Sequence, residues 1–431
     1  NTLKVGTINI GSATKAGNLT TIAGDLIFAS AINVTGGNVT AEASALDIAA
    51  SIGDADDLVA IVLDDNAGNA MLDIGATASI FGTIDGSATA GAGTSRIDAN
   101  AATTFEGNIG ENNAVEELEI GAASNLKGAI VTATATNFDA DVALSIGGAV
   151  AQTIDTVFTF DTLEEGTINV SNTAGLVTFK GQIGTTAARA KEIVIADDAD
   201  ATFEAAIFAN TLDINTAAAD DIITFTTGGH IIGDAGATAD AVQIAGGTIV
   251  LGTDIEGGTT VFDIKTVKND SDGLVIAAAV NIKPAATFQT GVITLFDGVD
   301  ATAYYANTAE ENFVTVSDTA LTKYTVSRTT ALKGDTFITA TAKTGDETAA
   351  ALGVDTNTGT ALQQIMAAAN TAADSTLIST LSDALTEVNG GLLSDAIALS
   401  KQAAPQTEMI SGGTVAAKGV TNSVQGIISN R

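Results

Sequence analysis

Two stretches of the sequence, TFEGNIG at residues 104–110 and TFKGQIG at residues 178–184, are copies of one motif. Aligning Phe105 with Phe179 extends the match through the apolar positions that follow each copy. The further aligned pairs are Ile109 with Ile183, Gly110 with Gly184, Ile120 with Ile195, Leu126 with Phe203 and Ile130 with Ile207. A weaker third copy aligns Phe225, Ile232, Gly233 and Ile244. A unit that recurs with small insertions indicates an array of similar structural repeats.

Short runs of alternating apolar residues surround these copies. LKVGTINIG (3–11), EGTINVS (165–171) and GGTIVLG (246–252) are examples, and alternation with period two is typical of β-strands. Gly, Asn and Asp clusters separate the runs. A drifting period of roughly 20–25 residues predicts a mainly β protein, a right-handed parallel β-helix (β-solenoid) over residues 1–285. A flat β-sandwich is the alternative. The β-helix requires Phe105, Phe179 and Phe225 inside, and the motif glycines at corners with positive φ.

Composition limits the core and the partners. Only 4% of the 431 residues are aromatic, so Ala, Val, Ile, Leu and Thr must build the interior. With 17 basic and 51 acidic residues the net charge is −34, which excludes nucleic acid as a partner because phosphates bind Lys and Arg. The chain has no cysteine and therefore no disulfide framework. It begins at Asn1 with a strand-like run, which fits a cytosolic protein or an exported one whose signal peptide has been removed.

Two changes of pattern divide the rest of the chain. Near Pro284 the repeats give way to a segment that contains all three tyrosines, and residues 286–345 are predicted to form a β cap that closes the end of the solenoid. From 346 to 431 a helical period takes over. Leu362, Ile365, Met366 and Ala369 lie on one helical face. A second run, Leu377, Leu381, Leu385 and Val388, predicts a further helix that ends at Gly390–Gly391.

This order of parts resembles the passenger of an autotransporter. The segment around GVITLFDG (291–298) is similar to an autochaperone cap, and the Ala- and Leu-rich stretch ending in GIISNR is similar to the linker that precedes the translocating outer-membrane barrel. The repeat coils look most like the rickettsial outer-membrane protein B and surface cell antigen family. The resemblance implies a cell-surface or extracellular protein on the Gram-negative exterior, with its signal peptide removed. It also implies attachment to the outer membrane through a barrel that this chain does not contain. The strongly acidic balance departs from that family.

No residue pattern favours catalysis. The one histidine, His230, lies in TTGGHIIG, and no GDSGG-like or GxSxG-like nucleophile motif is present; a turn position explains His230. Carboxylate pairs such as Asp56–Asp57, Asp64–Asp65 and Asp220–Asp221 raise the alternative of a β-helical polysaccharide-active enzyme. Tyr and Trp, on which sugars stack, are missing before residue 280. The KGD tripeptide at 333–335 is read as chance. We therefore expect no enzyme.

Clustered carboxylates raise the question of calcium, which takes six to eight oxygen ligands. The candidate ligands are Asp54, Asp56 and Asp57 in GDADD, Asp197, Asp198 and Asp200 in ADDAD, and Asp270 and Asp272 in KNDSDG. None of these follows an EF-hand loop or a GGxGxD series, and solvated turns are the alternative reading.

The expected function is a non-catalytic structural protein that assembles with itself into a surface layer or filament. Calcium shared between chains would then offset the repulsion of their carboxylates. The alternative is a monomeric adhesin that binds a receptor on a host or neighbouring cell.

Overall fold

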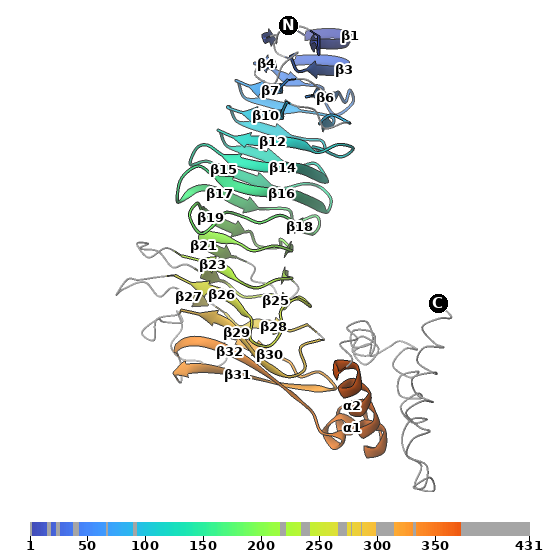
Figure 1. The fold of residues 1–431 in the computed structure, drawn as a ribbon, viewed down its shortest axis with the longest axis vertical. Helices are drawn as coiled ribbons and strands as arrows, with labels where there is room; N and C mark the ends of the chain where they lie inside the picture. Colours follow the sequence, from blue (N-terminus) through green and yellow to red (C-terminus); the bar gives the residue numbers. More distant parts are fainter. Residues whose placement is uncertain are drawn as a thin grey trace, which may run out of the picture.

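A computed structural model describes residues 2–371 except 15–18, 23–25, 38–42, 66–67, 89–92, 216–220, 234–241, 266–273, 277, 286, 299–313 and 331–332. Short strands are stacked along a long axis, with the N-terminus at one end and an antiparallel hairpin and two helices at the other (Figure 1). Every strand pair from β1 to β30 is parallel among the described residues. The predicted parallel β-helix is confirmed, and a sandwich of antiparallel strands is excluded.

The described strands form two sheets. One consists of β2 (Leu19–Ile22), β4 (Ser44–Ile48), β7 (Ala70–Ile74), β10 (Ser95–Ala99), β12 (Val115–Ile120), β14 (Ile130–Phe138), β16 (Gln152–Phe160), β18 (Val177–Phe179), β20 (Ala201–Phe203), β22 (Ile222–Phe225), β25 (Thr248–Leu251), β28 (Val280–Lys283) and β30 (Val314–Val316). The other consists of β1 (Thr2–Gly11), β3 (Leu26–Thr35), β5 (Ser51–Ile52), β6 (Ala60–Asp64), β8 (Ala78–Ile80), β9 (Ile84–Asp85), β11 (Thr103–Phe105), β13 (Ser124–Leu126), β15 (Ala143–Ile146), β17 (Glu165–Val170), β19 (Ala190–Ile195), β21 (Phe208–Ile214), β23 (His230–Ile232), β24 (Val242–Ile244), β26 (Thr260–Ile264), β27 (Leu274–Ile276), β29 (Gly291–Asp297), β31 (Thr322–Thr330) and β32 (Lys333–Ala342).

Inward side chains of successive coils lie over one another in columns, three of which contain residues of the repeated motif or continue them. The first column is Ile27, Ile52, Ile80, Phe105, Leu126, Ile146, Val170, Ile195, Ile214, Ile244 and Ile276. The second is Ile8, Ile32, Ile61, Ile84, Ile109, Val131, Ile154, Phe179, Phe203, Phe225 and Leu251. The third is Leu46, Leu72, Ile97, Leu118, Thr136, Phe158, Ile183 and Ile207, continued by His230, Phe262 and Phe296.

These columns form part of the hydrophobic core. Phe105, Phe179 and Phe225 are buried as predicted. Phe179 stacks on Phe203 with ring centroids 4.9 Å apart, and Phe203 stacks on Phe225 at 5.4 Å. Burying a phenylalanine ring contributes roughly 2–3 kcal/mol relative to exposing it, so this stack supplies a large part of the stability of the central coils.

The two copies of the motif lie on different faces of the β-helix. Phe105 belongs to the first column and Phe179 to the second, while Ile109 belongs to the second and Ile183 to the third. Three coils separate Phe105 from Val170 in the first column, and Phe179 follows one face later. The copies are therefore related by three coils plus one face. Phe179 and Phe225 therefore share one column, and Phe105 lies in another.

The motif keeps its glycines for two separate reasons. Gly110 and Gly184 have φ of 66° and 70°, in the left-handed region that only glycine adopts without strain. The first glycine of each motif packs against backbone instead. A Cβ on Gly107 would overlap the carbonyl oxygen of Gly82, and one on Gly181 would overlap that of Thr156. The predicted positive-φ corners are thus found at the second glycine of the motif, whereas the first permits close stacking of coils.

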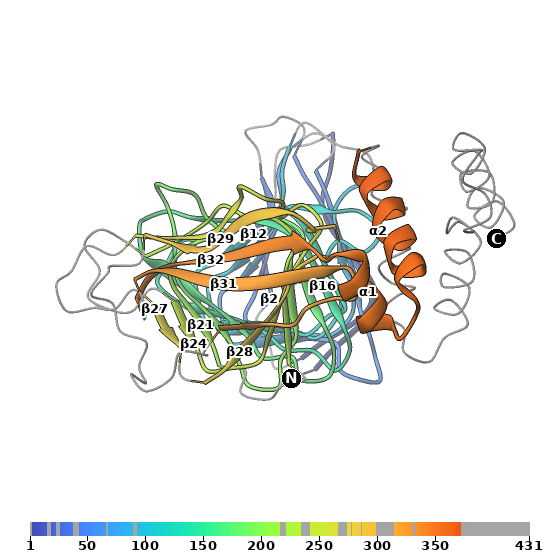
Figure 2. The same ribbon diagram turned by 90° about the horizontal axis from the view of Figure 1, so that it is seen from below.

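A β-hairpin closes the C-terminal end of the stack. β29 pairs in parallel with β26, then antiparallel with β32, which pairs antiparallel with β31. Seen from below, β31 and β32 cross the end of the solenoid (Figure 2). Tyr324 of β31 points inward, where its hydroxyl donates to the Phe288 carbonyl at 3.0 Å. The fold therefore includes the predicted β cap, although parallel pairing continues past residue 285 to β30.

Two helices follow the hairpin. α1 (Gly345–Leu352) begins at Thr344, which forms a capping box with Glu347, and ends at Gly353 with φ of 67°. α2 (Thr356–Thr371) places Leu362, Met366 and Ala369 against Leu321. This confirms the helical face predicted from 362 to 369. The second predicted helix, which begins at Leu377, lies outside the described residues. No helix in the described part of the chain has the length and apolarity needed to cross a bilayer.

Candidate functional site

Three carboxylates from two neighbouring coils meet at one corner of the solenoid. Asp197 and Asp198 lie in the turn after β19, and Asp221 directly precedes β22 in the next coil. One oxygen from each lies within 4.8 Å of the other two. Asp198 has φ of 61°, a conformation that aspartate tolerates better than most residues. Asp221 is buried, and the other two are exposed. This is the only group of three acidic, His or Cys side chains so close together among the described residues.

The arrangement agrees with part of the predicted ADDAD site. Asp200 stays outside the cluster, because its Oδ1 accepts a hydrogen bond from the Ile222 N–H at 2.7 Å. Sequence reasoning noted Asp221 as half of an acidic pair and did not assign it to this site. The period of the coils could have assigned it, because Asp221 lies one coil after Asp197. Carboxylate oxygens at this separation are suited to calcium. Calcium at this corner stays a prediction.

The predicted GDADD site is a self-contained turn. Oδ1 of Asp54 accepts the backbone N–H groups of Asp56 and Asp57, both at 2.9 Å. The Asp54 N–H donates to the Asp57 carbonyl at 3.2 Å. An aspartate whose oxygen accepts from the amides two and three residues later is a common turn former, so this carboxylate has a structural task. The structure does not bring Asp54, Asp56 and Asp57 together as a group of three carboxylates. Asp270 and Asp272 lie outside the described residues.

His230 is part of the core. Its side chain is fully buried between the rings of Phe225 and Phe262, at 5.0 and 5.3 Å. Nδ1 accepts the Ile207 N–H at 3.1 Å and Nε2 donates to the Thr227 carbonyl at 2.9 Å. Burial lowers the pKa of His230 from 6.5 to about 4, against a smaller opposing effect of the Thr227 carbonyl. The expectation of a turn position is wrong. His230 opens strand β23 because its ring continues an interior column.

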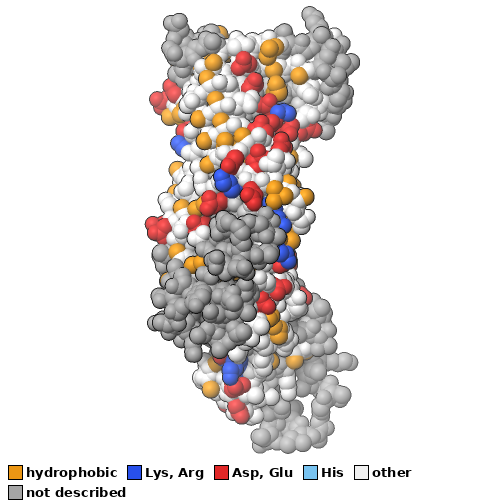
Figure 3. Space-filling view, turned by 90° about the vertical axis from the view of Figure 1, so that its left-hand side faces the viewer, with side chains coloured by type: hydrophobic (Ala, Val, Ile, Leu, Met, Phe, Trp, Pro, Cys, Tyr) orange, Lys and Arg blue, Asp and Glu red, His pale blue; other side chains and the backbone are white. Residues whose placement is uncertain are grey.

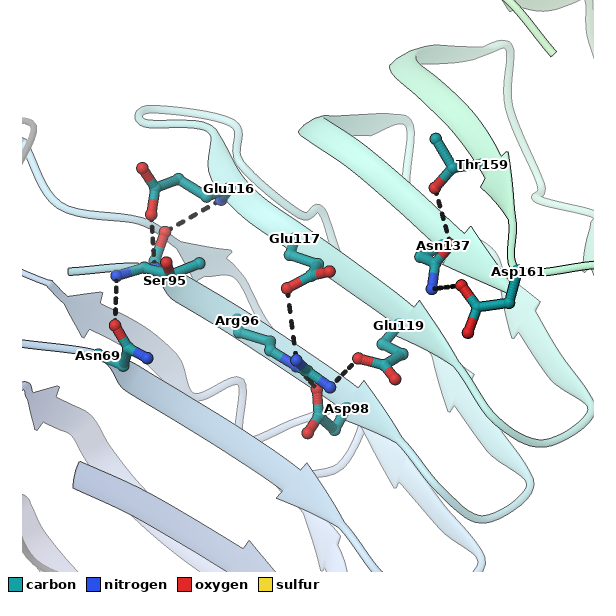
Figure 4. A network of polar contacts seen from close by, with 11 residues as sticks. Asn69, Ser95, Arg96, Asp98, Glu116, Glu117, Glu119, Asn137, Thr159 and Asp161 are labelled. Carbon is teal, nitrogen blue, oxygen red and sulfur yellow. Dashed lines mark hydrogen bonds and ion pairs between the residues drawn. The ribbon is translucent and has the colours of Figure 1, made fainter. Parts of the chain in front are cut away.

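A column of acidic side chains runs along the outside of the thirteen-stranded sheet. Asp47, Asp73, Asp98 and Glu119 occupy neighbouring positions on β4, β7, β10 and β12. Arg96 is the basic side chain among them, and it contacts Asp98, Glu119 and Glu117, the last at 3.5 Å (Figure 4). One guanidinium therefore compensates three carboxylates.

The pKa of Asp98 is raised above its usual value. Burial is the largest cause, and the charges of Asp73 and Glu117 add to it, while the hydrogen bond and the charge of Arg96 act in the opposite direction. Towards the next coils the column becomes neutral. Asn137 of β14 donates to Asp161 at 3.2 Å and accepts from Thr159 at 2.8 Å (Figure 4).

Another outer face carries small polar side chains. Ser79, Thr104, Asn125 and Ser145 occupy neighbouring positions on β8, β11, β13 and β15, and together with adjacent alanines they line a shallow groove of ≈ 380 Å³. Figure 3 shows one long side of the molecule, on which acidic side chains are spread widely and basic ones are few. The described surface thus combines flat strand faces with a negative charge.

Comparison with models of known protein families, with curated proteins and with solved structures found no match.

Proposed function

We propose that this chain is a non-catalytic structural protein of the cell surface that assembles with copies of itself into a layer or filament. One observation carries the proposal. The chain places its one histidine and its phenylalanine stack in neighbouring interior columns, where His230 contacts Phe225. The side chains that most often do chemistry or bind sugars therefore serve the stacking of coils. What remains outside is a repetitive surface.

The outer surface supports packing between copies. Small residues such as Ser79 and Ser145 let a neighbouring backbone approach closely. Identical strand spacing on two rods, about 4.8 Å per coil, also allows many equivalent contacts to form at once. Net charge opposes association, because −34 per chain makes copies repel. Assembly therefore requires ionic screening or a shared divalent cation, for which the cluster of Asp197, Asp198 and Asp221 is the best-formed candidate.

The proposed place of action follows from the order of parts. A parallel β-helix, an antiparallel cap and helices succeed one another from the N-terminus. This is the order that the resemblance to autotransporter passengers implies, and it supports export to the outer face of a Gram-negative cell.

Electron microscopy of the purified chain tests the proposal. We expect ordered sheets or fibres in calcium-containing buffer, and their loss on chelation with EDTA. Sodium chloride at equal ionic strength serves as the control for screening alone. Isolated rods under every condition, together with binding to cells, would instead identify a monomeric adhesin.

A further inference from the structure

One outer face of the central coils carries a column of threonines. Thr153, Thr178, Thr202 and Thr224 hold equivalent positions on β16, β18, β20 and β22, on the side of the rod where Figure 1 labels β16, β18 and β25. All four are half-buried and alternate with buried apolar residues, so their hydroxyls point outward. In the described structure no protein group forms a hydrogen bond with any of these hydroxyls. This threonine column is uncharged along four coils of a chain whose net charge is −34.

Exposed apolar side chains follow one edge of the threonine column. Val150 is 53% exposed, Leu176 is 41% exposed and Ile222 is 37% exposed. Each of them lies one to three residues before the threonine of its own coil. They are three of the nine large apolar side chains that are exposed in the described structure. Apolar side chains gathered along one edge, instead of scattered singly, mark a surface for another molecule.

Charges of alternating sign follow the other edge of the threonine column. Asp155, Lys180 and Glu204 occupy equivalent positions in three successive coils, because the Lys180 N–H donates to the Ile154 carbonyl and the Glu204 N–H to the Phe179 carbonyl. Lys180 Nζ lies 3.7 Å from Asp155 Oδ2, and both side chains are exposed. An exposed pair of this kind contributes little to the fold. A column that alternates in sign is instead complementary to a copy of itself that is turned end over end.

A two-fold axis across this face satisfies all three rows of side chains at once. The axis lies at right angles to the rod, midway between the coils of Asp155 and Lys180, so it reverses the order of coils and keeps each row opposite itself. Lys180 then lies opposite Asp155 of the second copy, and the reverse pair forms as well. The register of the coils sets Thr178 opposite Thr153 of the second copy.

The apolar edge and the next coils agree with this placement of the axis. Leu176 lies opposite Ala151 of the second copy, beside the exposed Val150, because Leu176 and Ala151 hold equivalent positions in neighbouring coils. The coil of Asp200 lies opposite the coil of Lys127, whose side chain is 38% exposed. An axis moved by one coil would pair Lys180 with Glu204 but would set Leu176 against the Asp200 carboxylate.

We propose that two copies of this chain pair side by side through the threonine column, antiparallel to each other about this axis. The contact combines apolar side chains, neutral hydroxyls and ion pairs, as protein interfaces do. A second copy is the partner because the face is complementary to itself, whereas an acidic or a basic partner would meet like charges along the alternating row. A two-fold contact closes on itself and leaves the other faces of both rods free. This inference rests on the proposed self-assembly and specifies its lateral contact.

Two charge-reversal variants test the contact. Lys180→Glu sets carboxylates opposite each other in the pair, and Asp155→Lys sets ammonium groups opposite each other. Both side chains are exposed, by 44% and 49%, so folding should survive, and circular dichroism checks this. Lys191→Glu and Asp141→Lys are the matched controls, because they reverse an equally exposed ion pair whose lysine belongs to β19 of the other sheet. Sedimentation velocity in EDTA, at about 0.15 M salt to screen general repulsion, separates pairs from single rods.

The lateral contact has a signature that other contacts lack. The unmodified chain and both controls should sediment as pairs, and each charge-reversal variant alone should have a Kd of pairing raised about tenfold or more. An equimolar mixture of Lys180→Glu and Asp155→Lys should recover the pairs, because each introduced charge then lies opposite its complement.

The remaining outcomes separate this contact from the proposed function. Pairs from Asp155→Lys alone would overturn the register, and pairs from both variants, or a mixture that stays single, would overturn the contact and leave self-assembly intact. Single rods of the unmodified chain in EDTA, with sheets or fibres in calcium, would also overturn only the lateral pair. Single rods with and without calcium would overturn both proposals.

Discussion

The imidazole of His230 accepts a hydrogen bond from the backbone N–H of Ile207 at 3.1 Å. The amide lies at the last residue before β21, and the ring belongs to β23 in the next coil. A side chain therefore takes the place of a backbone carbonyl between two coils. Because Nδ1 accepts and Nε2 donates to Thr227, the imidazole is neutral in the folded chain.

This geometry predicts a pH dependence. The folded pKa of about 4 lies below the unfolded value of 6.5, so the unfolded chain binds the proton more readily. The resulting stability is fully present above pH 6.5 and is lost as pH falls towards 4, by about 3 kcal/mol in total. In a proton NMR titration the single histidine should titrate near pH 4. A midpoint near 6.5 would contradict burial of the ring. His230→Phe should remove this part of the acid sensitivity.

Removing a ring from the phenylalanine stack should weaken the central coils. Phe203 lies between Phe179 and Phe225, and Phe203→Ala leaves a cavity that costs about 3–5 kcal/mol. Hydrogen exchange should show faster opening of β20 and its neighbours β18 and β22. Leu176→Ala, at a side chain 41% exposed, is the control and should change exchange little. Equal protection in both variants would show that the stack does not hold these coils together.

The first glycine of the motif should tolerate no side chain. Gly107→Ala forces a methyl group against the Gly82 carbonyl and should destabilise the coil by about 2–3 kcal/mol. Gly6→Ala is the matched control, since a Cβ there meets no atom within 4 Å. Limited proteolysis should cut the Gly107 variant near that coil and spare the Gly6 variant.

Arg96 should stabilise the fold by compensating the carboxylates of the acidic column. Arg96→Gln leaves Asp98 and Glu119, whose side chains are 10% and 13% exposed, without their counter-charge. We expect a loss of about 2 kcal/mol in the free energy of unfolding, smaller at high salt. Adding Glu119→Gln to the same variant should recover part of the loss. If the second substitution destabilises further, repulsion between carboxylates is not the cause.

The corner carboxylates should bind calcium. Terbium, a luminescent substitute for calcium, should bind the unmodified chain. Its affinity should fall once Asp198→Asn and Asp221→Asn remove two of the three carboxylates. Asp56→Asn with Asp57→Asn removes two carboxylates from a turn that does not gather three and serves as control. Equal terbium affinity in the unmodified chain and the Asp198, Asp221 variant would assign these residues to a solvated turn.

Local patterns in the sequence were sufficient to predict the class of fold. Alternation in runs such as EGTINVS specifies strands, and a recurring F-x-G-x-I-G unit specifies coils, because both depend only on which side chains neighbouring positions bury. The helix around Leu362 could also be predicted from the sequence, because it depends only on the spacing of apolar residues along the chain. Burial of Phe105, Phe179 and Phe225 followed from the same reasoning.

The face on which each coil places its motif was decided by tertiary structure alone. In β14 the run IVTATATNF carries the chain past a corner with a register shift between Thr132 and Ala135 instead of a glycine turn. Such local differences in coil length add up over three coils and move Phe179 one column away from Phe105. The same accumulation decides that Asp221 meets Asp197 and Asp198, and that His230 enters the core. Neighbours across coils depend on the summed length of every intervening turn, whereas strand and helix patterns depend on a few adjacent residues, and for that reason the sequence determined the solenoid and the structure determined its contacts.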